Sequence, residues 1–185
     1  SGSRGSGAVF FSGCVLGCVF CQNGTISRGR FGKTVSVPRL REIFHELIAQ
    51  GAHNINLVSP TPYVPAILEA LAEPLPAPVV WNTGGYERAE TLRMLEGKVQ
   101  IWLPDLKYAD NALARAYSGA ADYFETAAAA IREMHRQAGD CVMEDGLLKR
   151  GVVIRHLLLP GALDNAKAVM DWVAASFRPG QVLFS

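Results

Sequence analysis

The chain has 185 residues, of which 49% are hydrophobic and 19% are charged. This composition excludes collagen-like, mucin-like and disordered chains, and it predicts one compact domain with a sizeable core. The 18 basic and 17 acidic residues leave a net charge of +1, so no general attraction to nucleic acid or anionic lipid is expected. No uncharged apolar run approaches the roughly 18 to 20 residues that span a bilayer, so no membrane partner is expected either.

Short apolar runs alternate with amphipathic stretches along the chain, a pattern typical of β/α units around a mostly parallel sheet. Helical periodicity lies between consecutive strands, as expected of crossover helices. The predicted strands are 8–11, 54–58, 78–82, 99–103, 152–159 and 182–185, and the predicted helices are 38–48, 64–71, 124–131 and 166–173.

These elements predict an α/β fold, a partial (β/α)6 TIM-like barrel with parallel strands. A complete eight-unit barrel needs about 250 residues, whereas six strands share this chain at roughly thirty residues each. The strand at 182–185 has barely begun where the sequence stops, so we expect residues 1–185 to be a single domain from a longer chain. Residues 1–7 are small and polar rather than signal-like, and a cytoplasmic location is expected.

Three of the four cysteines, Cys14, Cys18 and Cys21, form the spacing C-x3-C-x2-C directly after the first predicted strand. Disulfide pairing would leave one thiol over. A structural zinc ion would need a fourth ligand from Cys141 or a histidine. Cys141 lies in the hydrophilic stretch 139–146 and is interpreted as an ordinary unligated cysteine.

An iron–sulfur cluster suits this spacing better, because a short loop of thiolates can wrap a cubane. With only three thiolates, one iron keeps an open coordination position. In structural metal sites the protein fills every coordination position, whereas catalytic sites keep one position open. A substrate or cofactor is therefore expected to bind at the open iron.

The cysteine motif, with the aromatic Phe20 before its last cysteine, resembles that of the radical S-adenosylmethionine (SAM) enzymes. Members of that family hold a 4Fe-4S cluster on a partial β/α barrel, in a loop after the first strand. Four stretches resemble more narrowly the pyruvate formate-lyase activating enzyme branch: 11–14, 21–23, 103–107 and 154–161. The resemblance covers nearly the whole chain.

The resemblance implies a radical SAM oxidoreductase in which Cys14, Cys18 and Cys21 are the metal ligands and the catalytic residues. One electron from the cluster would cleave SAM to a 5′-deoxyadenosyl radical that abstracts hydrogen, with activation of a glycyl-radical enzyme as one form of that reaction. The implied partners are an electron donor such as flavodoxin or ferredoxin, and a substrate that is either a glycyl-radical protein or a small molecule. The alternative is a structural metal-binding or iron–sulfur electron-transfer module without SAM chemistry.

Further candidate residues follow the predicted strands, because functional groups gather at the carboxyl edge of such sheets. Asp105 and Lys107 form either an exposed ion pair or, as the resemblance implies, a site at which Lys107 meets the charged or ribose groups of the cofactor. Arg155 would need an anionic partner if buried, and it is preferred to His156. The other candidates for cofactor binding are Phe20, Asn23, Asn82 and Thr83.

One segment departs from the family pattern. Many radical SAM enzymes carry Gly-Gly-Glu after the second strand, where it holds the amino group of the cofactor. Here the corresponding residues are Ser59-Pro60-Thr61-Pro62. The hydroxyls of Ser59 and Thr61 can accept an ammonium group, but a contact without a carboxylate is expected to be weaker.

Overall fold

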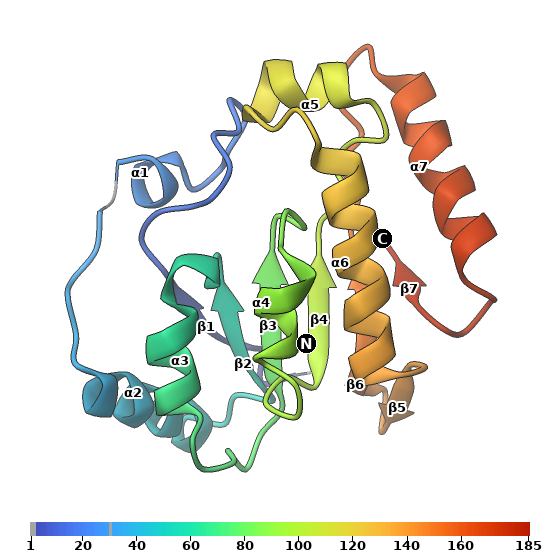
Figure 1. Ribbon diagram of the computed structural model, residues 1–185. Helices are drawn as coiled ribbons and strands as arrows, with labels where there is room; N and C mark the ends of the chain where they lie inside the picture. The colour runs from blue at the N-terminus through green and yellow to red at the C-terminus, as the bar shows by residue number, and fades with distance from the viewer. Residues whose placement is uncertain (1–2, 30) are drawn as a thin grey trace.

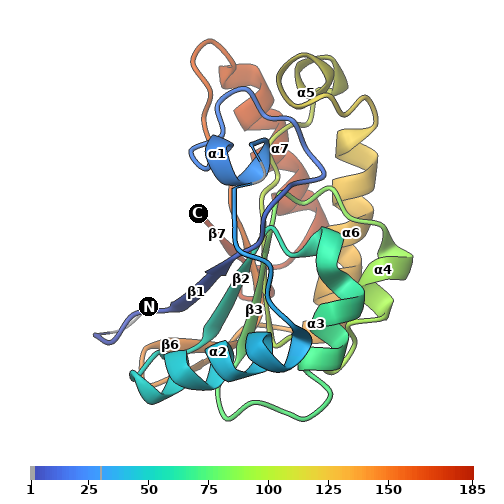
Figure 2. The ribbon, with the colours of Figure 1, turned by 90° about the vertical axis from the view of Figure 1, so that its left-hand side faces the viewer.

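The structure is a computed structural model that describes residues 3–29 and 31–185. In these residues one seven-stranded sheet forms the centre of the molecule, and α3, α4 and α6 lie along one of its faces (Figures 1 and 2). The cysteine-bearing segment, α1 and α5 lie beyond the carboxyl ends of the central strands (Figure 1).

The sheet is parallel except for one short strand, and its central order follows the chain as β1-β2-β3-β4-β6. Strands β5 and β7 both pair with β6, the first antiparallel and the second parallel. The strands are β1 (Gly7–Phe10), β2 (Ile55–Val58), β3 (Val79–Thr83), β4 (Ile101–Pro104), β5 (Val142–Glu144), β6 (Leu147–Ile154) and β7 (Leu183–Phe184). The predicted α/β fold with parallel strands is confirmed.

Each predicted helix is present in the structure. Shorter helices also occur in segments where no helical periodicity was recognised. Ser36 accepts a hydrogen bond from the Arg39 amide at 3.3 Å at the start of α2, as an N-cap residue does. The helices are α1 (Gly24–Ser27), α2 (Val37–Ala49), α3 (Val64–Ala70), α4 (Ala89–Arg93), α5 (Asn111–Ser118), α6 (Tyr123–Ala138) and α7 (Leu163–Ser176), with a 3-10 turn, η1 (Thr61–Tyr63). None of the helices in the described part of the chain has the length and apolar character needed to cross a membrane.

The core lies between the sheet and these helices. Trp81 of β3 and Trp102 of β4 occupy paired positions, are fully buried, and have ring centroids 6.3 Å apart. Phe44 of α2 and Ile131 of α6 are also fully buried in the same apolar cluster. Burial of side chains of this size stabilises the fold by about 1.5 to 3 kcal/mol each. The strands whose ends carry the candidate residues are thus held in place by a well-packed core.

The region around the fifth predicted strand differs from expectation. The hydrophilic stretch 139–146, where no strand was predicted, contains β5, and β6 begins at Leu147 and ends at Ile154 rather than spanning 152–159. Asp145 and Gly146 have φ values of 51° and 72°, so they form the tight two-residue connection that joins antiparallel strands. Beyond β6, Arg155 forms an isolated parallel bridge with Asp105.

Candidate cofactor site

The cysteine loop joins β1 to α1 and is held from above by the end of α5. The Gly17 amide donates to the Ser118 carbonyl at 3.0 Å, and the Val19 amide donates to the Tyr117 carbonyl at 2.9 Å. Cys18 is buried, and its sulfur accepts a hydrogen bond from the Ser118 hydroxyl at 2.9 Å. These contacts fix the middle of the loop.

The other two thiols are half-buried and have polar neighbours of their own. The Leu16 amide donates to the Cys14 sulfur at 3.5 Å, and the Cys21 sulfur lies 3.3 Å from the Ser27 hydroxyl. Burial raises the pKa of the Cys14 thiol, so this thiol must lose a proton when it binds a metal. No three His, Cys, Asp or Glu side chains among the described residues converge as a single metal ion requires. The thiols around a cubane each bind a different iron, so a cluster does not need them to converge on one point.

Three strand ends contact the cysteine loop from below. The Tyr63 hydroxyl, in the turn after β2, donates to the Ser12 carbonyl at 2.7 Å. A Cβ atom at Gly84, after β3, would lie 2.8 Å from Leu16 Cδ1, so the backbone at Gly84 lies directly against the Leu16 side chain. Lys107, after β4, places its ammonium 5.9 Å from the centroid of the Phe20 ring. The segments after β2, β3 and β4 therefore all contact the loop that carries the thiols.

Four predicted residues form one charged network beside this loop. Asp105 pairs with Lys107 through one carboxylate oxygen and with the Arg155 guanidinium at 2.8 Å through the other. The same guanidinium donates to Asn82 Oδ1 at 2.7 Å. The side chains of Asp105 and Lys107 are only 21% and 14% exposed, so the alternative of a solvent-exposed ion pair is wrong.

Tyr123, at the start of α6, holds the ends of β3 and β4 together. Its hydroxyl lies 2.7 Å from the Gly84 carbonyl and 2.8 Å from the Asp105 carbonyl, and it accepts a hydrogen bond from the Lys107 amide at 3.0 Å. A Cβ atom at Gly85 would lie 2.1 Å from the Asp105 carbonyl oxygen. Gly85 therefore allows the close approach of the neighbouring backbone at Asp105.

A buried carboxylate that the sequence analysis missed lies next to Thr61. Glu87 is 2% exposed, and its Oε1 accepts hydrogen bonds from Thr61 and Thr83 at 2.6 Å each and from Trp81 Nε1 at 3.1 Å. Thr83 thus faces Glu87 rather than the charged network. The available signal was an acidic residue two positions after the Gly-Gly pair that follows β3.

Asn23, Ser59 and His156 are not part of the charged network or of the contacts of Glu87. Asn23 is exposed at the N-terminus of α1, and in the described residues its side chain makes no capping hydrogen bond. The Ser59 amide donates to the Asn82 carbonyl at 2.9 Å, and its φ of 55° is unusual for a residue with a side chain. His156 packs through Nδ1 against the Leu106 carbonyl at 2.7 Å.

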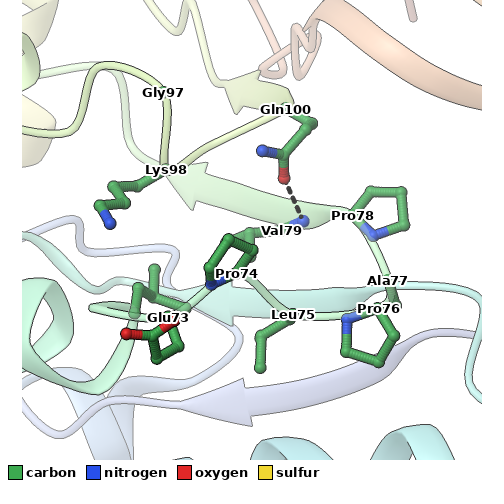
Figure 3. Close-up of a pocket in the computed structure, with 11 residues that line it drawn as sticks. Glu73, Pro74, Leu75, Pro76, Ala77, Pro78, Val79, Gly97, Lys98 and Gln100 are labelled. Atoms are coloured by element: carbon green, nitrogen blue, oxygen red, sulfur yellow. Dashed lines mark hydrogen bonds between the residues drawn. The ribbon is translucent and has the colours of Figure 1, made fainter.

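Figure 3 shows a pocket at the other end of the sheet, where β3 begins. Its wall includes the proline-rich segment 74–78 together with Lys98 and Gln100, and Gln100 Oε1 accepts the Val79 amide at 2.9 Å. The cysteine loop lies beyond the opposite, carboxyl ends of the strands (Figure 1). The pocket is therefore separate from the candidate site.

A family model described as the radical SAM superfamily matches residues 8–173. The chain belongs to the radical SAM superfamily. An uncharacterized protein of Methanocaldococcus jannaschii is 33% identical over 179 residues, which cover 91% of this chain and 49% of that protein. The chain thus spans about half the length of this curated relative.

Solved structures of the same fold include three proteins whose sequence identity to this chain is low. Streptococcus suis SuiB bound to SAM has a TM-score of 0.64 at 11% identity, covering 93% of this chain and 39% of SuiB. Methylornithine synthase (PylB) has a TM-score of 0.62 at 16% identity, covering 96% of this chain and 52% of that enzyme. HydG, a maturase of the [FeFe]-hydrogenase, has a TM-score of 0.64 at 13% identity, covering 96% of this chain and 42% of HydG.

The cofactors of a radical SAM chain are a 4Fe-4S cluster and SAM, and the residues at the carboxyl edge fit both. Three thiols on one loop form a suitable donor set for a cluster with one open iron. In the described residues Arg155 Nε is buried without a hydrogen-bond partner, so a donor remains available to an anionic group such as a carboxylate. Family membership favours SAM chemistry over the alternative of a purely structural or electron-transfer module.

Proposed function

We propose that Cys14, Cys18 and Cys21 bind three irons of the 4Fe-4S cluster and leave the fourth iron for SAM. The observation that carries this proposal is the contact of one cysteine loop with the ends of β2, β3 and β4, next to the network of Asp105, Lys107 and Arg155. When bound, the reduced cluster supplies the electron that cleaves SAM to the 5′-deoxyadenosyl radical for hydrogen abstraction.

In this proposal the chain orients SAM with its own polar groups. Arg155 and Lys107 supply positive charge for the SAM carboxylate or donors for its ribose, while Asp105 holds both cations in place. Ser59 and Thr61 accept the amino group. Phe20, Asn23, Asn82 and Thr83 complete the candidate set, with Phe20 covering Lys107.

We also propose a cytoplasmic protein in which residues 1–185 form one domain. Free thiols that must bind iron suit a reducing compartment. An electron donor such as flavodoxin or ferredoxin would reduce the cluster.

For the substrate, we propose the polypeptide of a glycyl-radical enzyme rather than a small molecule. The stretches at 103–107 and 154–161, which resemble the pyruvate formate-lyase activating enzyme branch, support this choice. One structural neighbour, SuiB, was solved bound to its precursor peptide SuiA, so a protein of this fold accepts a polypeptide. Incubation of the reduced, SAM-loaded protein with candidate glycyl-radical enzymes should produce a stable organic radical, and its absence with every candidate would favour a small molecule.

Anaerobic reconstitution with iron and sulfide tests the cofactor assignment. The reduced protein should give an electron paramagnetic resonance signal that changes when SAM is added, and dithionite should yield 5′-deoxyadenosine. Cys18→Ala should abolish the cluster and the cleavage. Cys141→Ala is the matched control, because Cys141 packs against Gly151 of β6, which pairs with Ile101 at the start of β4, and the change should leave both intact. A signal that SAM does not alter, with no 5′-deoxyadenosine, contradicts the proposal.

A further inference from the structure

Glu87 is a buried carboxylate whose hydrogen-bond donors are all uncharged side chains. Its three hydrogen-bond donors, the side chains of Thr61, Thr83 and Trp81, all point at Oε1. Its second oxygen, Oε2, is buried without a partner in the described part of the chain. An ionised carboxylate in such surroundings destabilises a protein unless it is paired. Acidic residues are rarely buried in this way, and a buried acid beside a candidate site is itself a sign of function.

The position of Glu87 links this acid to the cysteine loop. Thr61 begins the turn η1 that follows β2, and it stands in the segment that takes the place of Gly-Gly-Glu. Tyr63 of the same turn donates to the carbonyl of Ser12, two residues before Cys14. Glu87 therefore anchors a turn that touches the start of the cysteine loop.

The hydrogen bond from Thr61 to Glu87 determines what Thr61 can offer a ligand. A threonine hydroxyl has one proton and two acceptor lone pairs. Because the proton is used in the 2.6 Å bond to Glu87, the remaining capacity of Thr61 Oγ1 is that of an acceptor. An ammonium group has only donors, so it is the complementary ligand. A charged acceptor behind the hydroxyl strengthens such a contact, as the groups behind metal ligands do.

We propose that Glu87 is a positioning residue for SAM, fixing the Thr61 hydroxyl as an acceptor for the cofactor's amino group and supplying the negative charge that the segment 59–62 lacks. This inference rests on the proposed function. It accounts for the departure from the family motif, because the carboxylate is provided by the segment after β3 instead of the segment after β2.

Glu87→Gln tests the role of the charge, because the amide oxygen can still accept the three hydrogen bonds. The dissociation constants of two ligands should be measured by equilibrium dialysis with the reconstituted protein: SAM, and the SAM analogue in which hydrogen replaces the amino group. We expect Glu87→Gln to weaken SAM binding about tenfold. Binding of the analogue and the iron content should not change.

Three further variants separate positioning from general damage. Thr61→Val should give the same selective loss, and Thr61→Ser should restore the affinity for SAM. Trp81→Phe, which removes one bond to Glu87 and leaves Thr61 in place, should change the selectivity little. Thermal unfolding of each variant establishes that it is folded.

The inference is overturned if Glu87→Gln binds SAM as the wild type does, or if it weakens both ligands equally. If the wild-type protein binds neither ligand, the proposed function fails and this inference fails with it. If the wild type binds SAM normally and Glu87→Gln changes the affinities for SAM and the analogue equally, only the role of Glu87 is overturned and the proposed function stands.

Discussion

At the scale of single residues, the candidate residues at the strand ends could be predicted from the sequence. The side chains that hold the site in place could not. Asn82 lies near the end of β3, and Asp105, Lys107 and Arg155 follow β4 or β6, so parallel pairing was enough to bring them together. Ser118 supports Cys18 from 100 residues away along the chain. Contacts at such separations leave no local pattern in a single sequence.

The burial of Glu87 makes stability depend on pH in a direction that can be derived. Burial raises the pKa of Glu87 above its ordinary value of 4.5, although the hydrogen bonds from Thr61, Thr83 and Trp81 oppose the change. The folded state therefore holds this proton more tightly than the unfolded state. The contribution of Glu87 to the free energy of unfolding falls as pH rises above 4.5, until the raised pKa is passed.

Urea unfolding of wild type and Glu87→Gln across a pH series checks this dependence. The wild type should lose stability relative to Glu87→Gln as pH is raised from 4.5, because the glutamine has no proton to lose. At higher pH the difference should become constant. A difference that moves in favour of the wild type as pH rises contradicts the raised pKa.

At the scale of elements, the long amphipathic helices followed from periodicity, whereas the short elements did not. The β5–β6 hairpin had a signal, Asp145-Gly146, but the hydrophilic stretch 139–146 was not recognised as containing a strand. The eight residues of α5 show too few turns for a stripe to stand out. This short helix nevertheless holds the cysteine loop. Because the helix was not predicted, its contacts with the loop were not predicted either.

The junction between β3 and β4 should be much less tolerant of a side chain than other glycine turns. Gly85→Ala would place a Cβ atom 2.1 Å from the Asp105 carbonyl oxygen at a φ of +83°, which requires a backbone shift. We expect a loss of at least about 3 kcal/mol in the free energy of unfolding, measured with urea. Gly97→Ala is the matched control, because it has a φ of +77° with open space around its Cβ, and it should cost about 1 to 2 kcal/mol. Equal losses at both positions would show that the contact with Asp105 is unimportant.

At the scale of the whole molecule, the order of the strands determines where a site can lie. The sheet runs from β1 to β4 in chain order and continues with β6, so the loops after these parallel strands share one edge. The pairing places Phe10, Val58, Asn82 and Leu103 side by side, with their side chains on one face. The six parallel strands were predictable from the alternating pattern, because each crossover helix needs an apolar stripe, whereas the antiparallel strand β5 was not predicted. The closeness of the loops to one another was not, because it depends on contacts such as that between Tyr63 and Ser12.

Binding of SAM across several strand ends should stabilise the reconstituted molecule as a unit. A ligand at 100 times its dissociation constant stabilises the folded state by about 2.7 kcal/mol. For a chain of this length that corresponds to a rise in Tm of about 5 to 10 °C. Anaerobic thermal unfolding with and without SAM measures the rise.

The rise in Tm should depend on the carboxyl edge and not on the opposite end of the sheet. Lys107→Ala removes a cation from the proposed SAM site and should reduce the rise, while the iron content stays normal because Lys107 is not a proposed cluster ligand. Lys98→Ala removes a lysine from the pocket at the start of β3, where its ammonium donates to the Ala72 carbonyl at 3.0 Å, and should retain the full rise. An equal rise in both variants would place SAM away from Lys107, and a reduced rise in Lys98→Ala alone would move the binding site to the pocket of Figure 3.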